Sequence, residues 1–173
     1  DALPIFTPAL RALRRKYPRA RLAALCRPWV APVLEHNPDI DDLLVFDDKA
    51  PRAGWFGAIR ALRRERYELG VLFPNSFGSA LQMRLGGVKR RVGTALDARR
   101  FLLTDPVAVT DEILQKHMVE YYLNILKDIV DVAKAERRLV VEPGETERES
   151  MLAKLKEHNR SEERRVGKEC ATG

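Results

Sequence analysis

Apolar residues recur along this chain with a spacing that alternates between that of helices and that of strands. Thr7 and Pro8 form a typical helix start, a capping residue followed by proline at the first helical position, and Pro18 ends the segment. Each later segment of helical spacing is followed by a short apolar run. The pattern predicts strands near residues 21–26, 43–46, 69–73 and 90–93, and helices near residues 7–17, 28–35, 60–64 and 77–85.

The C-terminal half of the chain shows one longer helical pattern. Asp111 is a capping residue, and apolar residues mark a buried side that continues to about Ala133. These residues are Ile113, Met118, Tyr121, Tyr122, Ile125 and Ile129. Phe101–Leu103 and Leu139–Val141 are predicted to be short extended pieces, and residues 146–158 a charged terminal helix.

The order of these elements predicts the fold class. Strands separated by helices imply a parallel sheet, because parallel neighbours need a crossover connection. Arg60–Arg64 repeats the residues of Arg11–Arg15, as expected of two helix-then-strand units that cover one sheet. We therefore predict a three-layer α/β sandwich with a mostly parallel sheet over residues 6–158. Residues 1–5 and 159–173 resemble translated adapter sequence, and we expect them to be artefactual; the alternative for residues 159–173 is a disordered tail.

Composition narrows the class of protein. The 173 residues are 45% apolar, which suffices for one hydrophobic core, and the net charge of +6 indicates an anionic partner such as nucleic acid, phosphorylated glycolipid, nucleotide or membrane surface. Cys26 lies in an apolar run and is predicted to be a core residue, and two cysteines in all suggest a reducing compartment. No apolar run approaches the roughly 20 residues that span a bilayer. Walker A, dinucleotide-binding and nucleophile-elbow motifs do not occur in the sequence.

One polar turn is the most informative local pattern. Val71-Leu-Phe-Pro-Asn-Ser-Phe-Gly-Ser79 ends a buried strand and opens a helix. In a parallel sheet this turn lies at the carboxyl edge, where open α/β sheets bind ligands, and a helix N-terminus there favours an anion. Asn75, Ser76 and Ser79 are therefore candidates for hydrogen bonds to sugar hydroxyls or phosphate. The alternative is that Ser76 or Asn75 only caps the helix.

Two basic positions are further candidates for contacting an anionic acceptor. Lys89-Arg-Arg91 enters a strand, where Arg91 is suited to bidentate contacts, although a solvated strand edge explains the triplet equally. His117 opens the predicted long helix, and a lone histidine is more often a structural hydrogen-bonding residue. No other His or Cys has metal-ligand spacing to it, so we predict no metal site. We expect Asn75, Ser76, Arg91 and His117 to face one cleft.

Four segments occur together in an informative order. They are Thr7-Pro-Ala-Leu-Arg-Ala-Leu-Arg-Arg-Lys-Tyr-Pro18, Leu72-Phe-Pro-Asn-Ser-Phe-Gly-Ser-Ala80, Lys89-Arg-Arg-Val-Gly93 and His117-Met-Val-Glu-Tyr-Tyr122. In order and approximate spacing they resemble the ADP-heptose:lipopolysaccharide heptosyltransferases of glycosyltransferase family 9, with the second segment most similar to heptosyltransferase II. The resemblance extends from residue 6 to about residue 158, and the ordered set is more specific than any single motif.

The resemblance implies an activity and a set of partners. Residues 6–158 would form the N-terminal, Rossmann-like half of a GT-B glycosyltransferase, which binds the lipopolysaccharide inner core as acceptor, while ADP-heptose would bind to a C-terminal half that we expect to be missing here. The family's inverting transfer does not strictly require a metal, and no cofactor is expected. Its general base is an Asp six residues before the proline equivalent to Pro8. That position is Ala2, and Asp1 is one residue out of register, so we expect the chain to be inactive.

Family membership would place the protein in the cytoplasm, with peripheral contact to the inner membrane. One alternative is a small basic α/β module that binds nucleic acid or another anion, but the arginines are spread over several helices and aromatic residues make up only 7% of the chain. Another is a flavodoxin-like signalling domain, which needs an acidic cluster at a sheet edge. The acidic residues Asp39, Asp41, Asp42, Asp47 and Asp48 flank one strand and fit better with keeping a sheet edge soluble. Nucleic acid is therefore not expected as a partner.

Overall fold

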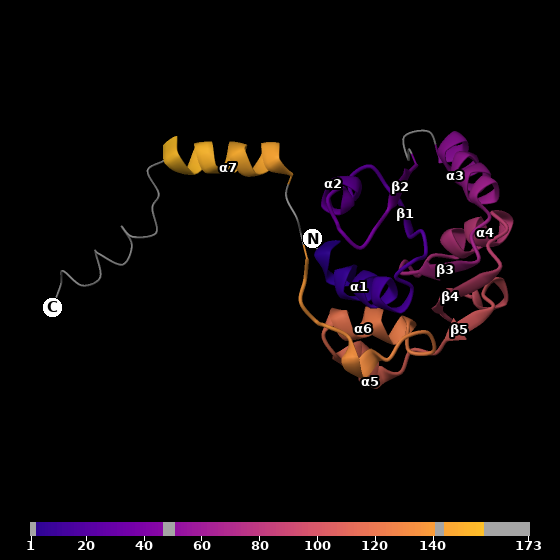
Figure 1. Ribbon diagram of the computed structural model, residues 1–173. Helices are drawn as coiled ribbons and strands as arrows, with labels where there is room; N and C mark the ends of the chain where they lie inside the picture. Colours follow the sequence, from indigo (N-terminus) through magenta and orange to yellow (C-terminus); the bar gives the residue numbers. More distant parts are fainter. Residues whose placement is uncertain (1–2, 47–50, 141–143, 158–173) are drawn as a thin grey trace. The chain divides into compact units, whose positions relative to one another are not determined.

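The computed structural model describes residues 3–46, 51–140 and 144–157 (Figure 1). Its contacts divide the chain into two units, residues 1–141 and 142–173. The second unit contributes the described helix α7 (Glu145–Glu157), close to the charged helix predicted at residues 146–158. All candidate site residues that the structure describes lie in the first unit.

Helices and strands alternate through the first unit, as the apolar pattern predicts. The strands are β1 (Ala23–Cys26), β2 (Asp42–Val45), β3 (Leu69–Leu72), β4 (Arg90–Thr94) and β5 (Asp105–Val107). The α-helices are α1 (Thr7–Lys16), α2 (Ala31–Leu34), α3 (Pro51–Glu65), α4 (Phe77–Leu85), α5 (Asp111–Gln115) and α6 (Met118–Ile125). Short 3-10 helices are η1 (Leu3–Phe6), η2 (Arg100–Leu102) and η3 (Val132–Lys134).

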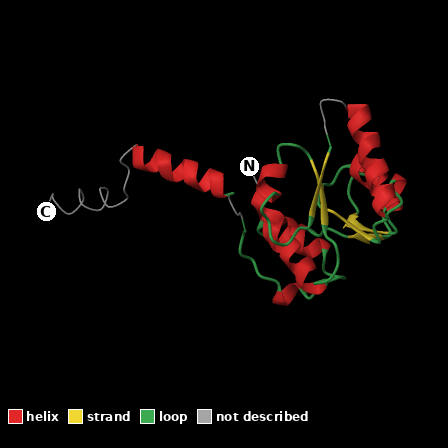
Figure 2. Cartoon of the chain, turned by 45° about the horizontal axis from the view of Figure 1, so that its top comes forward, coloured by secondary structure: helices red, strands yellow, loops and turns green. Residues whose placement is uncertain are grey.

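Every described pair of neighbouring strands is parallel. β1 pairs with β2, and β3, β4 and β5 pair in that order, with Val71 opposite Val92 and Val92 opposite Asp105. The predicted parallel pairing is thus confirmed. The strands form two separate sheets, however, where the sequence predicts a single one (Figure 2). We call them the β1–β2 ladder and the β3–β4–β5 ladder.

Hydrophobic side chains cover both faces of the β3–β4–β5 ladder. Val71 and Val92 pack in a core cluster with α1 and α6, in which Leu123 and Ile125 are fully buried. The next residue of β3, Leu72, packs in a second cluster with α4 and η2. Since successive side chains of a strand point to opposite faces, the two clusters lie on opposite sides of the ladder. The ladder is therefore the middle of three layers, as predicted (Figure 1).

The prediction of one long helix from residue 111 to about residue 133 is wrong, because the structure has two shorter helices there. Lys116 and His117 separate α5 from α6. Lys116 has an extended backbone, and Nδ1 of His117 accepts a hydrogen bond from the Val119 amide at 3.3 Å, which caps a new helix. Met118, predicted to lie on the buried side, is 44% exposed.

Two of the predicted extended pieces also differ from the structure. Phe101–Leu103 lies largely within η2 rather than in a strand. Leu139 and Val140 lie outside any strand, and Val141 is outside the described residues. β5 was not predicted from the sequence. Pro106 has no backbone N–H to donate to a neighbouring strand, so residues 105–107 are atypical of a strand except at a sheet edge.

The N-terminal predictions need two corrections. Thr7 does not cap α1 but is its first residue, fully buried, and its Oγ1 accepts a hydrogen bond from the Val140 amide at 3.0 Å. The helix predicted at residues 28–35 is shortened to α2. Trp29, which lies in the predicted helix but before the start of α2, is 60% exposed. Cys26 is buried, as predicted.

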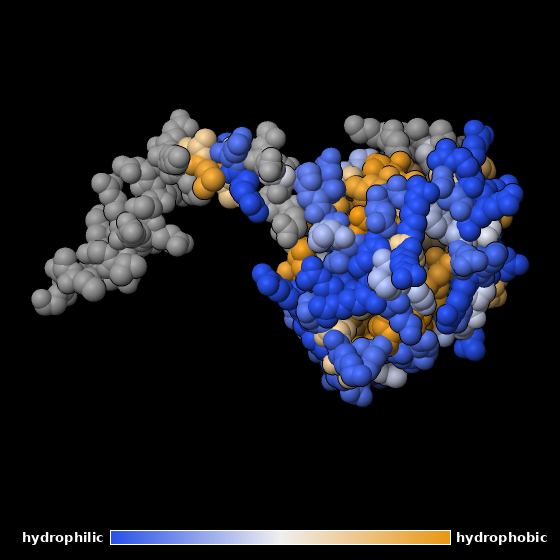
Figure 3. Space-filling view, viewed as in Figure 1, coloured by the Kyte–Doolittle hydropathy of each residue, from blue (hydrophilic) through white to orange (hydrophobic). Residues whose placement is uncertain are grey.

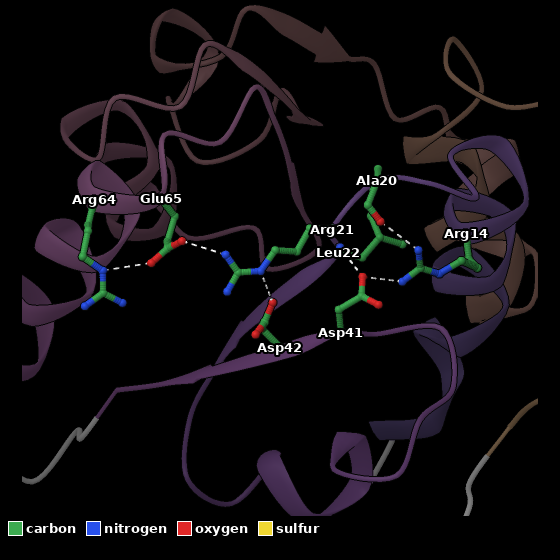
Figure 4. A network of polar contacts seen from close by, with 8 residues as sticks. All are labelled: Arg14, Ala20, Arg21, Leu22, Asp41, Asp42, Arg64 and Glu65. Carbon is green, nitrogen blue, oxygen red and sulfur yellow. Dashed lines mark hydrogen bonds and ion pairs between the residues drawn. The ribbon is translucent and has the colours of Figure 1, made fainter.

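Ion pairs connect the β1–β2 ladder to α1 and α3. Much of the face of the first unit seen in Figure 3 is hydrophilic, and Figure 4 shows one polar network of this unit. Asp41, just before β2, accepts a hydrogen bond from Nη2 of Arg14 in α1 at 2.6 Å. Arg21 donates to Asp42 of β2 and, at 2.8 Å, to Glu65 of α3. The network therefore connects α1 and α3 to the β1–β2 ladder through side chains.

These contacts lower the pKa values of the carboxyl groups. The hydrogen bond from Arg14 holds the pKa of Asp41 below its usual value, and the hydrogen bond from Arg21 does the same for Asp42. A carboxyl whose pKa is lower in the folded state stabilises the fold above its unfolded pKa, about 3.9 for Asp. This contribution is lost as the pH falls through the folded pKa.

We expect the double variant Asp41→Asn, Asp42→Asn to lose less thermal stability than the parent chain when the pH is lowered from about 7 to about 3. The reason is that the variant has no carboxyl groups to protonate at these positions. The measurement is the thermal midpoint by circular dichroism at both pH values. Asp128→Asn, at an exposed position outside the network, is the control. An identical pH dependence in the double variant and the parent would contradict this account.

Candidate active site

The turns that follow β3, β4 and β5 meet at one edge of their ladder. Leu72 at the end of β3 lies opposite Gly93 of β4, and Thr94 at the end of β4 lies opposite Val107 at the end of β5. Open α/β sheets bind ligands outside the carboxyl ends of their strands. Residues 74–79, which comprise the turn after β3 and the first residues of α4, lie at this edge and carry three of the predicted site residues. We refer to them below as the turn of residues 74–79.

A cavity of about 310 Å³ opens beside this turn. Its wall comes from the turns after β3 and β4 and from helices α5 and α6. The lining residues are Phe73, Pro74, Asn75, Leu96, Ile113, Leu114, Met118, Tyr121 and Tyr122. The ring of Tyr122 packs edge-on against those of Phe73 and Tyr121, with centroids 5.6 Å apart in both pairs. An apolar, aromatic cavity with a small number of polar groups is the usual composition of a small-molecule site.

Asn75 holds the polar side of the cavity in place. Its Nδ2 and Oδ1 atoms lie 2.7 and 3.0 Å from the Tyr121 hydroxyl. Oδ1 also accepts hydrogen bonds from the Thr94 hydroxyl at 2.7 Å and from Arg99 Nη2 at 3.4 Å. The amide is therefore oriented by residues from α6 and from the end of β4, which fixes the direction in which the turn faces the cavity.

Ser76 caps α4, which is the alternative to ligand binding that the sequence analysis gives for this residue. Its Oγ accepts a hydrogen bond from the Ser79 amide at 3.3 Å, and the Ser79 hydroxyl donates to the Ser76 carbonyl at 2.8 Å. Ser76 is also exposed at the helix N-terminus, where the helix dipole favours an anion. Capping and ligand contact are thus compatible at this position.

Arg91 lies away from the other candidates. Its position opposite Gly70 places it near the amino end of β4 rather than at the carboxyl edge. Nε donates to the Leu102 carbonyl at 2.7 Å, and Nη1 donates to the Val88 carbonyl at 2.6 Å. The expectation that Arg91 shares a cleft with Asn75 is therefore wrong, because its guanidinium is held by backbone oxygens at the opposite edge.

His117 and Asp1 complete the predicted set. His117 is exposed and caps α6 directly before Met118, which lines the cavity, but His117 itself is not a lining residue. Asp1 lies outside the described residues, as does Ala2. The structure thus brings Asn75, Ser76 and Ser79 together in one turn, with His117 at the start of a helix that borders the same cavity.

Sequence reasoning missed three residues that organise this edge. Thr94 and Arg99 are fully buried and hydrogen-bonded to each other and to the turn. Tyr121 lies in the core, as predicted, but its hydroxyl also contacts Asn75, which was not predicted. The strand end at Thr94 was the available signal, since a polar residue at the carboxyl end of a buried strand often faces a site. Nothing comparable marks Arg99.

Two further properties of the described residues concern metal ions and membranes. Within them, no group of three or more His, Cys, Asp or Glu side chains is arranged to hold a metal ion. None of the helices in the part of the chain that the structure describes is long and apolar enough to cross a membrane.

A parallel α/β domain with helices on both faces of its sheet belongs to the doubly wound fold class, in which ligands bind at the carboxyl edge of the strands. Residues 55–165 match the family model of glycosyltransferase family 9 (heptosyltransferase). The chain belongs to this family.

Two curated relatives indicate how much of a family member this sequence represents. Lipopolysaccharide heptosyltransferase 2 of Escherichia coli (strain K12) is 30% identical over 127 residues, which are 68% of this chain and 34% of that protein. Lipopolysaccharide heptosyltransferase 2 of Salmonella typhimurium is 28% identical over 127 residues, with the same coverage. The chain thus spans about a third of the length of these relatives.

Solved structures confirm the fold class. The structure of E. coli ADP-heptose LPS heptosyltransferase II matches with a TM-score of 0.70 at 23% identity, covering 88% of this chain and 46% of that one. The glycosyl transferase family 9 structure from Veillonella parvula DSM 2008 matches with a TM-score of 0.76 at 20% identity, covering 91% and 46%. At these identities the match shows the fold alone.

The Tyr121–Asn75 contact makes a testable contribution to stability. We expect Tyr121→Phe to lower the free energy of unfolding by about 1 kcal/mol, because the partly buried Asn75 amide loses a hydrogen-bond partner. Tyr122→Phe is the matched control, since the hydroxyl of this neighbouring tyrosine makes no hydrogen bond among the described residues. Urea denaturation measures both. Equal effects of the two substitutions would show that the contact does not stabilise the fold.

Proposed function

We propose that this chain is the acceptor-binding part of a glycosyltransferase that transfers heptose from ADP-heptose to the inner core of lipopolysaccharide. The observation that carries the proposal is the cavity beside Asn75 at the carboxyl edge, in a chain of glycosyltransferase family 9. The names of the relatives, lipopolysaccharide heptosyltransferases 2 and 3, support the acceptor and donor classes.

The cavity and the adjoining start of α4 carry groups suited to sugar recognition, although Ser76 and Ser79 do not line the cavity themselves. The apolar faces of sugar rings pack against aromatic side chains, and Phe73, Tyr121 and Tyr122 supply such surfaces. Ser76 and the first amides of α4 lie at a helix N-terminus that favours an anionic group of the acceptor. We propose Asn75, Ser76 and Ser79 as acceptor-binding residues, with His117 at the margin of the same site.

The catalytic step requires groups beyond those that the structure describes. The reaction needs a carboxylate that removes the proton of the attacking acceptor hydroxyl, and Asp1 is the available candidate by the family resemblance. It also needs the nucleotide sugar held against the acceptor. We propose that the family's second half supplies the donor site, in line with relatives about three times as long as the matched segment.

Arginine pairing argues against the alternative of a basic nucleic-acid-binding module. Such a module needs a cluster of cationic side chains available to phosphates. Here many arginines pair with carboxylates of the same chain: Arg11 with Asp39, Arg14 with Asp41, Arg21 with Asp42, Arg90 with Asp105 and Arg137 with Glu120.

We propose a cytoplasmic protein that contacts the inner membrane peripherally, where the acceptor glycolipid lies.

A pair of substitutions at Ser76 tests acceptor binding. Asp and Asn both cap helices well, so neither Ser76→Asp nor Ser76→Asn should unfold α4. We expect Ser76→Asp to weaken binding of the anionic, deacylated core oligosaccharide of a heptose-deficient lipopolysaccharide by roughly five-fold through charge repulsion, and Ser76→Asn to change it little. Isothermal titration calorimetry measures the affinities. If the parent chain binds mixed-sequence RNA but not the oligosaccharide, the proposed acceptor is wrong.

The polypeptide of 173 residues is expected to bind this oligosaccharide without transferring heptose to it. Positioning of two reactants contributes roughly 7–11 kcal/mol to such a reaction and a general base about 10²–10⁴-fold in rate. The position that the family resemblance assigns to the base lies outside the described residues, and the donor site is proposed to belong to the family's second half. Mass spectrometry after incubation with ADP-heptose and heptose-deficient lipopolysaccharide measures transfer. Heptose addition above a no-protein control would refute this expectation.

A further inference from the structure

Arg99 is the largest fully buried side chain of the described residues, and none of its hydrogen-bond partners is a carboxylate. Nε donates to the Thr94 carbonyl at 2.9 Å, and Nη2 donates to the Thr94 hydroxyl at 2.7 Å. Burial lowers the pKa of the guanidinium, because removing a charge from water costs solvation free energy. A buried charge persists only where surrounding oxygens satisfy its donors.

The remaining partners of Arg99 all lie in the turn after β3. Nη1 donates to the Pro74 carbonyl, to the Ser76 carbonyl at 3.3 Å and to the Ser79 hydroxyl at 3.5 Å. Nη2 reaches Oδ1 of Asn75 at 3.4 Å. A single planar group therefore connects the end of β4 to four residues of the turn that carries the candidate acceptor-binding side chains.

The two residues before Arg99 have an unusual backbone conformation. Asp97 and Ala98 both adopt the left-handed conformation, with φ of 55° and 52°, which residues with a Cβ atom rarely adopt. Gly93 lies beside the guanidinium: a Cβ atom there would contact Arg99 Nη2 at an ordinary distance of 3.4 Å, and it would crowd the Cβ atom of Leu72 at 3.1 Å. Two successive strained residues thus precede the buried side chain, and a glycine lies beside it.

We propose that Arg99 is a positioning residue, which locks the turn of residues 74–79 in the conformation that presents Ser76 and the start of α4 to the acceptor. Arg99 is fully buried and acts through the turn. The role in acceptor binding rests on the function proposed above, whereas the effect on the order of the turn does not. Lysine cannot replace arginine here, because a single ammonium cannot reproduce a planar fork of donors that reaches two turns at once.

The test compares Arg99→Lys with Arg91→Lys in the 173-residue chain. Arg91 also donates to backbone carbonyls, but at the amino end of β4, so it is a matched control. We expect the backbone ¹⁵N order parameters of residues 75–78 to fall from about 0.85 to below about 0.6 in Arg99→Lys, while those of α6 stay unchanged. Binding of the core oligosaccharide should weaken roughly ten-fold by calorimetry, because the loosened turn must be ordered on binding. Arg91→Lys should change neither quantity.

Each outcome separates the two proposals. Unchanged order parameters in the turn of Arg99→Lys would overturn the positioning role, whatever the binding result. If the parent chain does not bind the oligosaccharide, the proposed function fails, and the order parameters still decide the role of Arg99 in the turn. If Arg99→Lys does not fold, Thr94→Val replaces it, since it removes the hydroxyl that bridges Arg99 and Asn75. A turn as rigid in Thr94→Val as in the parent chain would then overturn the proposal.

Discussion

Parallel pairing of β3, β4 and β5 is the constraint on which the candidate site depends. Parallel neighbours end at the same edge, so the turn after β3 and the loop after β4 are brought side by side although about twenty residues separate them. The α4 crossover then covers one face of the ladder, and the chain returns through α5 and α6 to cover the other. The cavity lies where these returning helices pass the carboxyl edge.

A buried guanidinium adds a second condition to this arrangement. Taking an arginine out of water is costly, and here no carboxylate offsets the cost through a hydrogen bond. Carbonyl, hydroxyl and amide oxygens of Pro74, Asn75, Ser76, Ser79 and Thr94 compensate instead, and they do so only when both turns are folded. The network therefore makes the order of one turn depend on the other, as fully satisfied buried polar networks do.

Local signals account for what the sequence predicts well. The strand at residues 69–72 and the helix at residues 77–85 are bounded by Pro74, the capping Ser76 and Gly86, and their predicted limits agree closely with the structure. Tertiary effects account for the failures. A capping side chain, His117, divides the long helix. The periodicity of a strand does not say how far along it Arg91 lies from the edge that binds ligands. The burial of Arg99 depends on oxygens from a distant turn, so composition and spacing carry no sign of it.

The division of the long helix has a consequence for the cavity. A straight helix presents a convex surface, whereas two short helices that meet at Lys116 and His117 can contribute to a concave wall. Leu114 in α5 and Met118 in α6 line this wall, yet they are 60% and 44% exposed. Exposed apolar side chains grouped at a cavity commonly mark a binding surface, since covering them removes apolar area from water. The polar turn at Asn75 and the apolar side chains of the two helices thus border the same cavity, a combination that is typical of small-molecule sites.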